Sequence, residues 1–211
     1  MTGDDPTHIA SGPCAPDPTT ITDAKAVLAK YRIEFGGPFS ESAKSVQAEN
    51  KVVATAYKSL EAAAEVFRKQ GIRPEILGDT ITGEAREVGS EMAQLARRTK
   101  GPAALISGGE CTVTIEGEGG RGGRCAEFLL SLGIETGGIW AIAADTDGID
   151  GTEDNAGAIL TPESMKKGVD GKAFLARHDS YGFFEKLGDL VGHRSDARPT
   201  SMTTARSWSP S

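Results

Sequence analysis

The feature of this sequence that most restricts its fold is a series of short apolar runs, each closed by a loop and followed by a helical pattern. The runs at 103–107 and 139–143 are almost wholly apolar and have the length of strands rather than of buried helices. Strands without polar alternation are typical of a parallel sheet that is covered on both faces. The sequence therefore predicts an α/β fold with largely parallel sheets and helices on both faces.

The rest of the chain continues this alternation. Helices are expected at 21–31, 59–70, 84–98 and through 128–132, with two or three short helices within 162–190. Further strands are expected at 52–56, 74–77, 112–115 and 156–160. Four prolines between positions 6 and 18 indicate an ordered opening loop, because each proline restricts itself and the residue before it.

Composition excludes several classes of protein. The 211 residues, 38% hydrophobic and 25% charged, are typical of a globular chain with a real core. The net charge of −7 argues against a nucleic-acid partner, which requires clustered Lys and Arg. No apolar run has the length that spans a membrane, and the first residues lack the pattern of a secretory signal. Three scattered cysteines fit a reduced cytoplasm.

A glycine-rich loop at 117–124, Gly-Glu-Gly-Gly-Arg-Gly-Gly-Arg, is the first candidate site. Gly120, Gly122 and Gly123 would let the backbone approach an anion, and Arg121 and Arg124 would supply charged donors beside a helix N-terminus. This combination suits a phosphate or a carboxylate. A flexible hairpin or linker is the alternative. A dinucleotide fingerprint fits poorly, because no acidic ribose-binding residue follows at the usual interval.

An acidic loop at 145–154 is the second candidate site. Asp145, Asp147 and Asp150 follow the strand at 139–143, at the end of a sheet strand where open α/β folds bind ligands. Clustered carboxylates repel one another, so they are usually retained for a metal ion, a proton transfer or hydrogen bonds to loop amides. A solvated Asp-Gly turn is the alternative.

Two weaker signals remain. Ser107, Gly108, Gly109 and Glu110 would form an anion-binding turn after a strand, or a purely structural turn. Asp5 and Ser11 in the opening loop would reach a cleft, or only shape that loop.

Taken as a set, these segments resemble glycerate 2-kinases of the MOFRL type, a family also labelled hydroxypyruvate reductase. The resemblance covers residues 3–191 in order. Its clearest segments are Ile106-Ser107-Gly108-Gly109-Glu110, Gly120-Arg121-Gly122-Gly123-Arg124 and Ala144-Asp145-Thr146-Asp147-Gly148-Ile149-Asp150-Gly151.

The resemblance implies the C-terminal part of a two-domain kinase that phosphorylates D-glycerate at its 2-hydroxyl with ATP and Mg²⁺. Residues 1–100 would complete the N-terminal nucleotide-binding domain, and 101–191 would form the C-terminal MOFRL domain. Arg121 and Arg124 would hold the glycerate carboxylate or the transferring phosphoryl group. Asp145 and Asp147 would bind Mg²⁺ or orient the attacking hydroxyl, with Asp150 as a third metal ligand. The other residues expected to bind substrate or phosphate are Asp5, Ser11, Ser107, Gly108, Gly109, Glu110, Gly120, Gly122 and Gly123.

The sequence also departs from the family. Cys125 and Ala126 stand where an Asn-Gln pair is expected, and the lysine-bearing N-terminal part of the family is missing. Two other functions therefore stay open: an NAD(P)H-dependent hydroxypyruvate reductase, and a non-catalytic remnant. The sequence leaves a homo-oligomer open.

The resemblance stops after Val191, and residues 192–211 form a tail rich in Ser, Thr, Arg and Pro. We expect this tail to be aberrant, translated out of frame, and therefore disordered. Permissible codons for Arg198–Trp208, read from the third base of the first codon, give the family ending Thr-Asn-Val-Asn-Asp. Resequencing of the locus checks this expectation. If no single-base insertion or deletion restores that ending in an overlapping frame, the tail is native.

Overall fold

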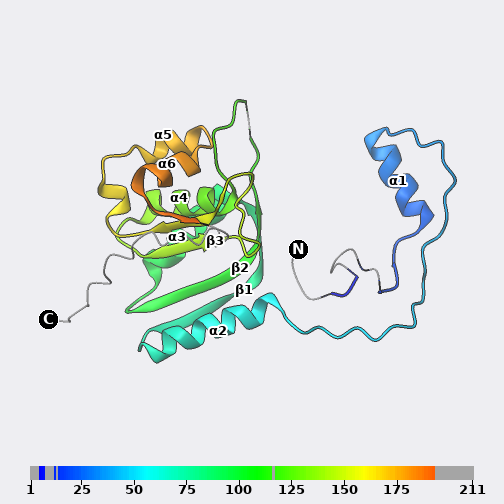
Figure 1. Ribbon diagram of the computed structural model, residues 1–211, viewed down its shortest axis with the longest axis horizontal. Coiled ribbons are helices and arrows are strands. Elements are labelled where there is room, and N and C mark those ends of the chain that lie inside the picture. Colours follow the sequence, from blue (N-terminus) through cyan, green and yellow to red (C-terminus); the bar gives the residue numbers. More distant parts are fainter. Residues whose placement is uncertain (1–4, 8–11, 13, 116, 193–211) are drawn as a thin grey trace. The chain divides into compact units, whose positions relative to one another are not determined.

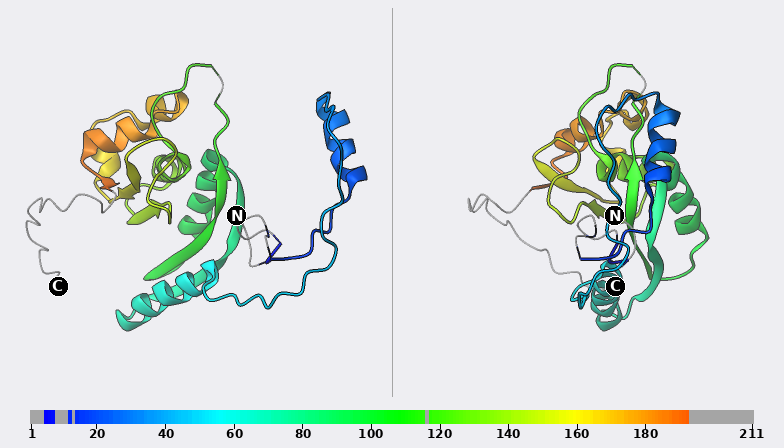
Figure 2. Two further views of the ribbon diagram at one scale, coloured as in Figure 1. Left: turned by 45° about the vertical axis from the view of Figure 1, so that its right-hand side comes forward. Right: turned by 90° about the vertical axis from the view of Figure 1, so that its right-hand side faces the viewer.

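The computed structural model describes residues 5–7, 12, 14–115 and 117–192 (Figures 1 and 2). The chain forms two compact units. The first takes residues up to 81 together with 102–110, and the second takes 82–101 and the chain from 111 onward. Two long strands, β1 (Arg73–Glu84) and β2 (Ala103–Thr112), run from the first unit into the second.

The first unit contains helices α1 (Ile21–Tyr31) and α2 (Ala56–Lys69). Thr20 and Asp23 form a reciprocal capping box at the start of α1, and Thr55 caps α2 by accepting the Lys58 N–H at 3.2 Å. The expected helix at 21–31 is confirmed. The expected strand at 52–56 is wrong, because Thr55 turns the chain into α2 and 52–54 pair with no described strand.

The strands β1 and β2 form a two-stranded sheet with α3 (Ala85–Arg98) between them in the chain. Their pairing is parallel: Arg73 N–H donates to the Pro102 carbonyl at one end, and Thr112 Oγ1 lies 3.4 Å from the Gly83 carbonyl oxygen at the other. β2 continues through Gly109, where a Cβ would lie 1.9 Å from the Ile81 carbonyl oxygen. The predicted turn at 107–110 and separate strand at 112–115 are therefore wrong, because the glycines allow close strand pairing.

The second unit is built around α4 (Arg124–Thr136), which is buried on almost every side. This helix packs against α3, β3 (Ala141–Ala144), β4 (Asn155–Leu160), α5 (Gly171–Ala176) and α6 (Ser180–Leu187). In Figure 1, α3 and α4 lie side by side, with α5 and α6 beyond α4. The core residues include Leu129, Leu130, Leu160, Phe183 and Phe184. The helices expected through 128–132 and within 162–190 are confirmed, and the latter include the short η2 (Ser164–Lys166).

The second sheet has the order β3-β4-β5, with β5 at Leu190–Gly192, and both of its pairings are antiparallel. The α/β class is confirmed, but the parallel, doubly covered strand expected at 139–143 is wrong. The connection at 145–154 forms a hairpin and is too short for a parallel crossover. One face of β3 packs on α4, while Ile142 on the other face is 65% exposed.

Gly89 should be indispensable for the packing of α3 on α4. A Cβ at this position would lie 2.4 Å from the Phe128 carbonyl oxygen. Ala normally stabilises a helix relative to Gly, but overpacking here should make Gly89→Ala destabilising by about 1–3 kcal/mol. Denaturant unfolding measures the change, with Ser90→Ala in the same helix as the control. An equal or higher stability of Gly89→Ala would contradict the close approach.

Candidate active site

A hollow of about 490 Å³ opens on the second unit, where three segments of the chain meet. The end of β2 and the residues after it form one wall, the start of α4 forms the floor, and the acidic loop after β3 forms the other wall. The lining residues are Cys111, Val113, Ile115, Gly122, Gly123, Arg124, Asp145, Asp147, Ile149 and Gly151. The hollow thus brings together five of the predicted site residues.

An ion pair between Arg124 and Asp145 occupies this hollow. Arg124 Nε lies 2.9 Å from Asp145 Oδ2, and its Nη2 contacts the same oxygen. Burial opposes ionisation of Asp145, whose side chain is 9% exposed. Hydrogen bonds from Arg124 and from the Asp147 N–H nevertheless hold the pKa of Asp145 below its usual value. The pair therefore presents a carboxylate and a guanidinium side by side.

Asp147 is the exposed carboxylate of the hollow. Its N–H donates to Asp145 Oδ1 at 3.4 Å, and its own Oδ1 accepts the Ile149 N–H at 3.2 Å. These bonds define a tight turn, and they leave the second oxygen of Asp147 in a position where an ion could reach it. Asp145 and Asp147 are therefore the candidates for a metal ion.

Asp150 has a different environment, because it is fully buried under the start of α4. Its Oδ1 accepts the Cys125 N–H at 2.9 Å and its Oδ2 accepts the Ala126 N–H at 2.8 Å. Gly123 at the N-cap offers no side-chain bond, so Asp150 caps the helix from a distant loop. Burial raises the pKa of Asp150, and the two amide bonds offset only part of this effect. We infer that Asp150 is a helix cap rather than a metal ligand.

The glycine-rich loop is packed rather than open. Gly120 N–H donates to the Arg177 carbonyl at 2.8 Å, and Tyr181 N–H donates to the Arg121 carbonyl at 3.0 Å. A Cβ at Gly123 would lie 2.3 Å from Asp150 Oδ1. These glycines are needed because the loop lies directly against α6 and the Asp150 cap.

Arg121 does not line the hollow. Its guanidinium pairs with Glu153 at 2.8 Å and stacks over the Tyr181 ring at 3.9 Å from the ring centre. Tyr181 in turn donates its hydroxyl to Asp154 at 3.0 Å. These contacts favour a role for Arg121 in fastening the glycine-rich loop to the acidic loop and α6.

The remaining predicted residues lie elsewhere. Ser107, Gly108, Gly109 and Glu110 belong to β2 in the first unit. Asp5, also in that unit, accepts the N–H and hydroxyl of Thr7 at 2.8 and 2.7 Å, as in an Asx turn. Ser11 lies outside the described residues, as does the tail from 193 onward.

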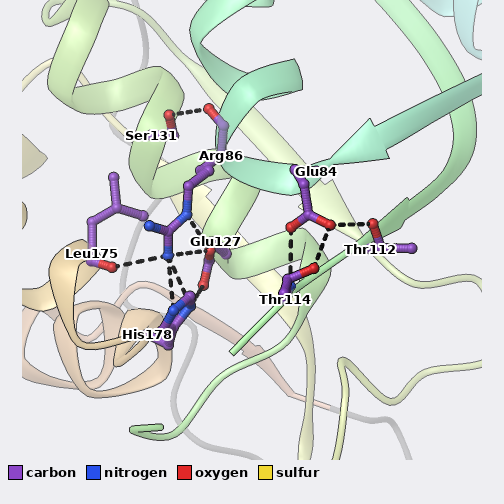
Figure 3. A network of polar contacts seen from close by, with 8 residues as sticks. All are labelled: Glu84, Arg86, Thr112, Thr114, Glu127, Ser131, Leu175 and His178. Atoms are coloured by element: carbon purple, nitrogen blue, oxygen red, sulfur yellow. Dashed lines mark hydrogen bonds and ion pairs between the residues drawn. The ribbon is translucent and has the colours of Figure 1, made fainter. Parts of the chain in front are cut away.

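Sequence reasoning missed a polar network between α3 and α4 that is mostly buried (Figure 3). Arg86 Nη2 lies 2.8 Å from Glu127 Oε1, and His178 Nδ1 lies 3.1 Å from Glu127 Oε2. The Arg86 backbone carbonyl also accepts a hydrogen bond from the Ser131 hydroxyl at 2.6 Å. The three ionisable residues come from α3, α4 and the turn before α6, so no sequence spacing could have indicated them.

A metal ion in the hollow would need ligands from outside the protein. Across the described part of the chain, no group of three or more His, Cys, Asp or Glu side chains is placed to hold one. Mg²⁺ commonly takes one or two carboxylates and completes its shell with water and substrate phosphates, which fits Asp145 and Asp147. The same residues contain no helix both long and apolar enough to cross a bilayer.

Comparisons with known proteins agree on one group of relatives. Residues 103–200 match the MOFRL family, and residues 1–46 match the domain of unknown function DUF4147. The chain is 47% identical over 90% of its length to an Agrobacterium vitis protein provisionally named a hydroxypyruvate reductase, of which it covers 49%. It is 36% identical over 90% of its length to a glycerate 2-kinase from Pyrococcus horikoshii, of which it covers 50%.

A solved structure is also similar. The crystal structure of a glycerate kinase from Thermotoga maritima matches 91% of this chain with a TM-score of 0.78 and 34% identity, over 51% of that protein. The chain thus spans about half the length of the curated relatives it matches. The domain boundary at residue 101 stays a prediction, because the compact units divide within β1 and β2 instead. The MOFRL match runs past residue 191, so the aberrant tail also stays a prediction.

Substitution of Asp150 should destabilise the protein much more than substitution of Asp147. Loss of the buried cap in Asp150→Ala should cost about 2–4 kcal/mol, because two helix amides lose a charged acceptor. Asp150→Asn should be intermediate, and the exposed Asp147→Asn should stay within about 0.5 kcal/mol of the original protein. Denaturant unfolding measures all three. Equal losses at both positions would argue against the cap.

Proposed function

We propose, from the membership of residues 103–200 in the MOFRL family, that this chain is half of a glycerate 2-kinase. The whole enzyme would transfer the γ-phosphoryl group of ATP to the 2-hydroxyl of D-glycerate, with ADP and 2-phosphoglycerate as products. The names of the Pyrococcus and Thermotoga relatives support this reaction. The chain's own contribution would be the anion and metal subsite of the MOFRL domain.

The observation that carries the proposal is the paired Arg124 and Asp145 in the hollow. Phosphoryl transfer requires mainly positioning of the two reactants and neutralisation of charge. Arg124 offers fixed donors for a carboxylate or a phosphoryl oxygen. Asp145 and Asp147 would hold Mg²⁺, which when bound neutralises phosphate charge. In the alternative role, one of the two carboxylates would accept a hydrogen bond from the attacking hydroxyl and so orient it.

The ion pair implies that metal and substrate bind cooperatively. While Asp145 accepts from Arg124, neither charge is fully available to a ligand. Mg²⁺ at Asp145 would compete with Arg124 for the carboxylate and release the guanidinium for an anion. An anion at Arg124 would release Asp145 in the same way, because coupling between two sites is reciprocal.

Cys125 is unsuited to a chemical role in this site. Burial, together with the negative charges of Asp150 and Asp145, raises the pKa of its thiol to about 12. The thiolate is the reactive form of cysteine, so this thiol stays neutral at ordinary pH. At the start of α4, Cys125 therefore only puts a small neutral side chain where the related kinases have a polar one.

A reductase acting on hydroxypyruvate is the second candidate, favoured by the name of the Agrobacterium relative. The two reactions are separated by their products. A coupled assay follows ADP formation with D-glycerate and ATP, and a parallel assay follows NADH oxidation with hydroxypyruvate. NADH oxidation without ADP formation would replace the kinase proposal.

We expect no glycerate-dependent ADP formation from the 211-residue chain alone, and activity once it is joined to the N-terminal half of a relative. In the joined enzyme, Arg124→Ala should lower kcat/KM by two orders of magnitude or more, about 3 kcal/mol, because a charged donor is lost from the site. Lys166→Ala, which removes an exposed charge from a surface pair, is the matched control. Near-normal kinetics of Arg124→Ala would leave the ion pair purely structural.

A further inference from the structure

Glu84 lies at the N-cap of α3, where its own side chain makes no capping bond. Its carboxylate instead accepts three hydrogen bonds from the last residue of β2 and from the chain just after it (Figure 3). The donors are the Thr112 hydroxyl at 2.7 Å, the Thr114 hydroxyl at 2.7 Å and the Thr114 N–H at 2.9 Å. These bonds, the Thr112 hydroxyl first, hold the pKa of Glu84 below its usual value. Glu84 is therefore an ionised acceptor aimed at a neighbouring segment.

The segment that Glu84 holds is one wall of the hollow. β2 ends at Thr112, and residues 113–115 belong to no strand, so the regular ladder no longer supports them. In an extended chain, successive side chains point to opposite sides. Thr112 and Thr114 point to Glu84, whereas Cys111, Val113 and Ile115 line the hollow. The even-numbered side chains are the anchor and the odd-numbered ones are the wall.

The residue that holds the wall, Glu84, is also connected to α4, the helix that forms the floor of the hollow. Arg86, two residues after Glu84, reaches Glu127 of α4, and α4 begins with Arg124. The start of α3 therefore connects the wall on one side with the helix that carries Arg124 on the other (Figure 3). A shift of the wall relative to this frame would change the width of the hollow.

We propose that Glu84 is a positioning residue: its carboxylate supports the chain where β2 ends and residues 113–115 no longer pair, and so holds Cys111, Val113 and Ile115 as the apolar wall opposite Asp145 and Asp147. Its importance for catalysis rests on the proposed function, whereas its effect on the wall does not. Without Glu84, the wall residues should move away from the hollow and become accessible to solvent.

Cys111 provides an internal reporter of this wall. In a Cys14→Ser, Cys125→Ser background, the rate of modification of Cys111 by a neutral maleimide measures its exposure. Glu84→Ala should raise this rate about tenfold, because three bonds to a charged acceptor are lost and local opening becomes easier. Glu84→Gln keeps an acceptor oxygen and should restore most of the protection. Glu87→Ala removes the same charge from the exposed side of α3 and should leave the rate unchanged.

A second reporter separates positioning from general destabilisation. In a Cys14→Ser, Cys111→Ser background, modification of Cys125 on α4 should be the same with and without Glu84→Ala. An unchanged rate at Cys111, or a parallel rise at Cys111 and Cys125, would overturn the proposal. Because no substrate enters this measurement, failure of the glycerate kinase assignment would not alter its outcome.

Discussion

The candidate site depends on the buried carboxylate of Asp150, which accepts the first amide hydrogens of α4. A helix N-terminus leaves several N–H groups without partners, and a negative charge there also meets the positive end of the helix dipole. Here the acceptor comes from a loop 24 residues further along the chain than Ala126. The single carboxylate therefore joins the acidic loop to the start of α4, directly after the glycine-rich loop. The floor of the hollow and its acidic wall take their relative positions from it.

The helix that Asp150 caps is the axis of the second unit. It contacts α3, two strands and two further helices. Gly89 of α3 lies against the backbone of α4, so a side chain at position 89 would not fit between the two helices. The network of Arg86, Glu127 and His178 crosses the same interface. Burying charges is costly, and the attraction between them repays the cost only with good geometry. We infer that this network contributes more to the orientation of α3 on α4 than to total stability.

The charges in the hollow are balanced before any ligand arrives. Arg124 and Asp145 neutralise one another in a half-buried position, whereas Asp147 remains exposed. A neutral pair costs less to keep in this environment than either charge alone. The same pairing means that a cation and an anion would each open the site for the other. In the proposed kinase reaction, a metal-bound phosphate and an anionic acceptor would be present together.

The sequence by itself determined the elements whose causes are local. The helix at 21–31 was predicted with Thr22 or Asp23 as its cap, and the structure places the cap at Thr20. The apolar residues from Phe128 to Leu132 indicated the helix that forms the core of the second unit. The loops at 117–124 and 145–154 were each predicted as a candidate site from their residue types, and only the resemblance to MOFRL kinases implied one shared site. That resemblance agrees with the relatives found. Arg124, Asp145 and Asp147 are accordingly in the hollow.

Only the tertiary structure decided which partners the charged residues meet. Asp150 looked like Asp147 in the sequence, but the amides of α4 make one a cap and leave the other exposed. Arg121 looked like Arg124, but Tyr181 and Glu153 engage it away from the hollow. The strand at 139–143 was expected to be parallel because it lacks polar alternation. It pairs antiparallel instead, since an apolar run does not specify which strand lies next to it. Glu84, Arg86 and His178 gave no sequence signal, because the segments they join are distant in the chain and meet only through packing.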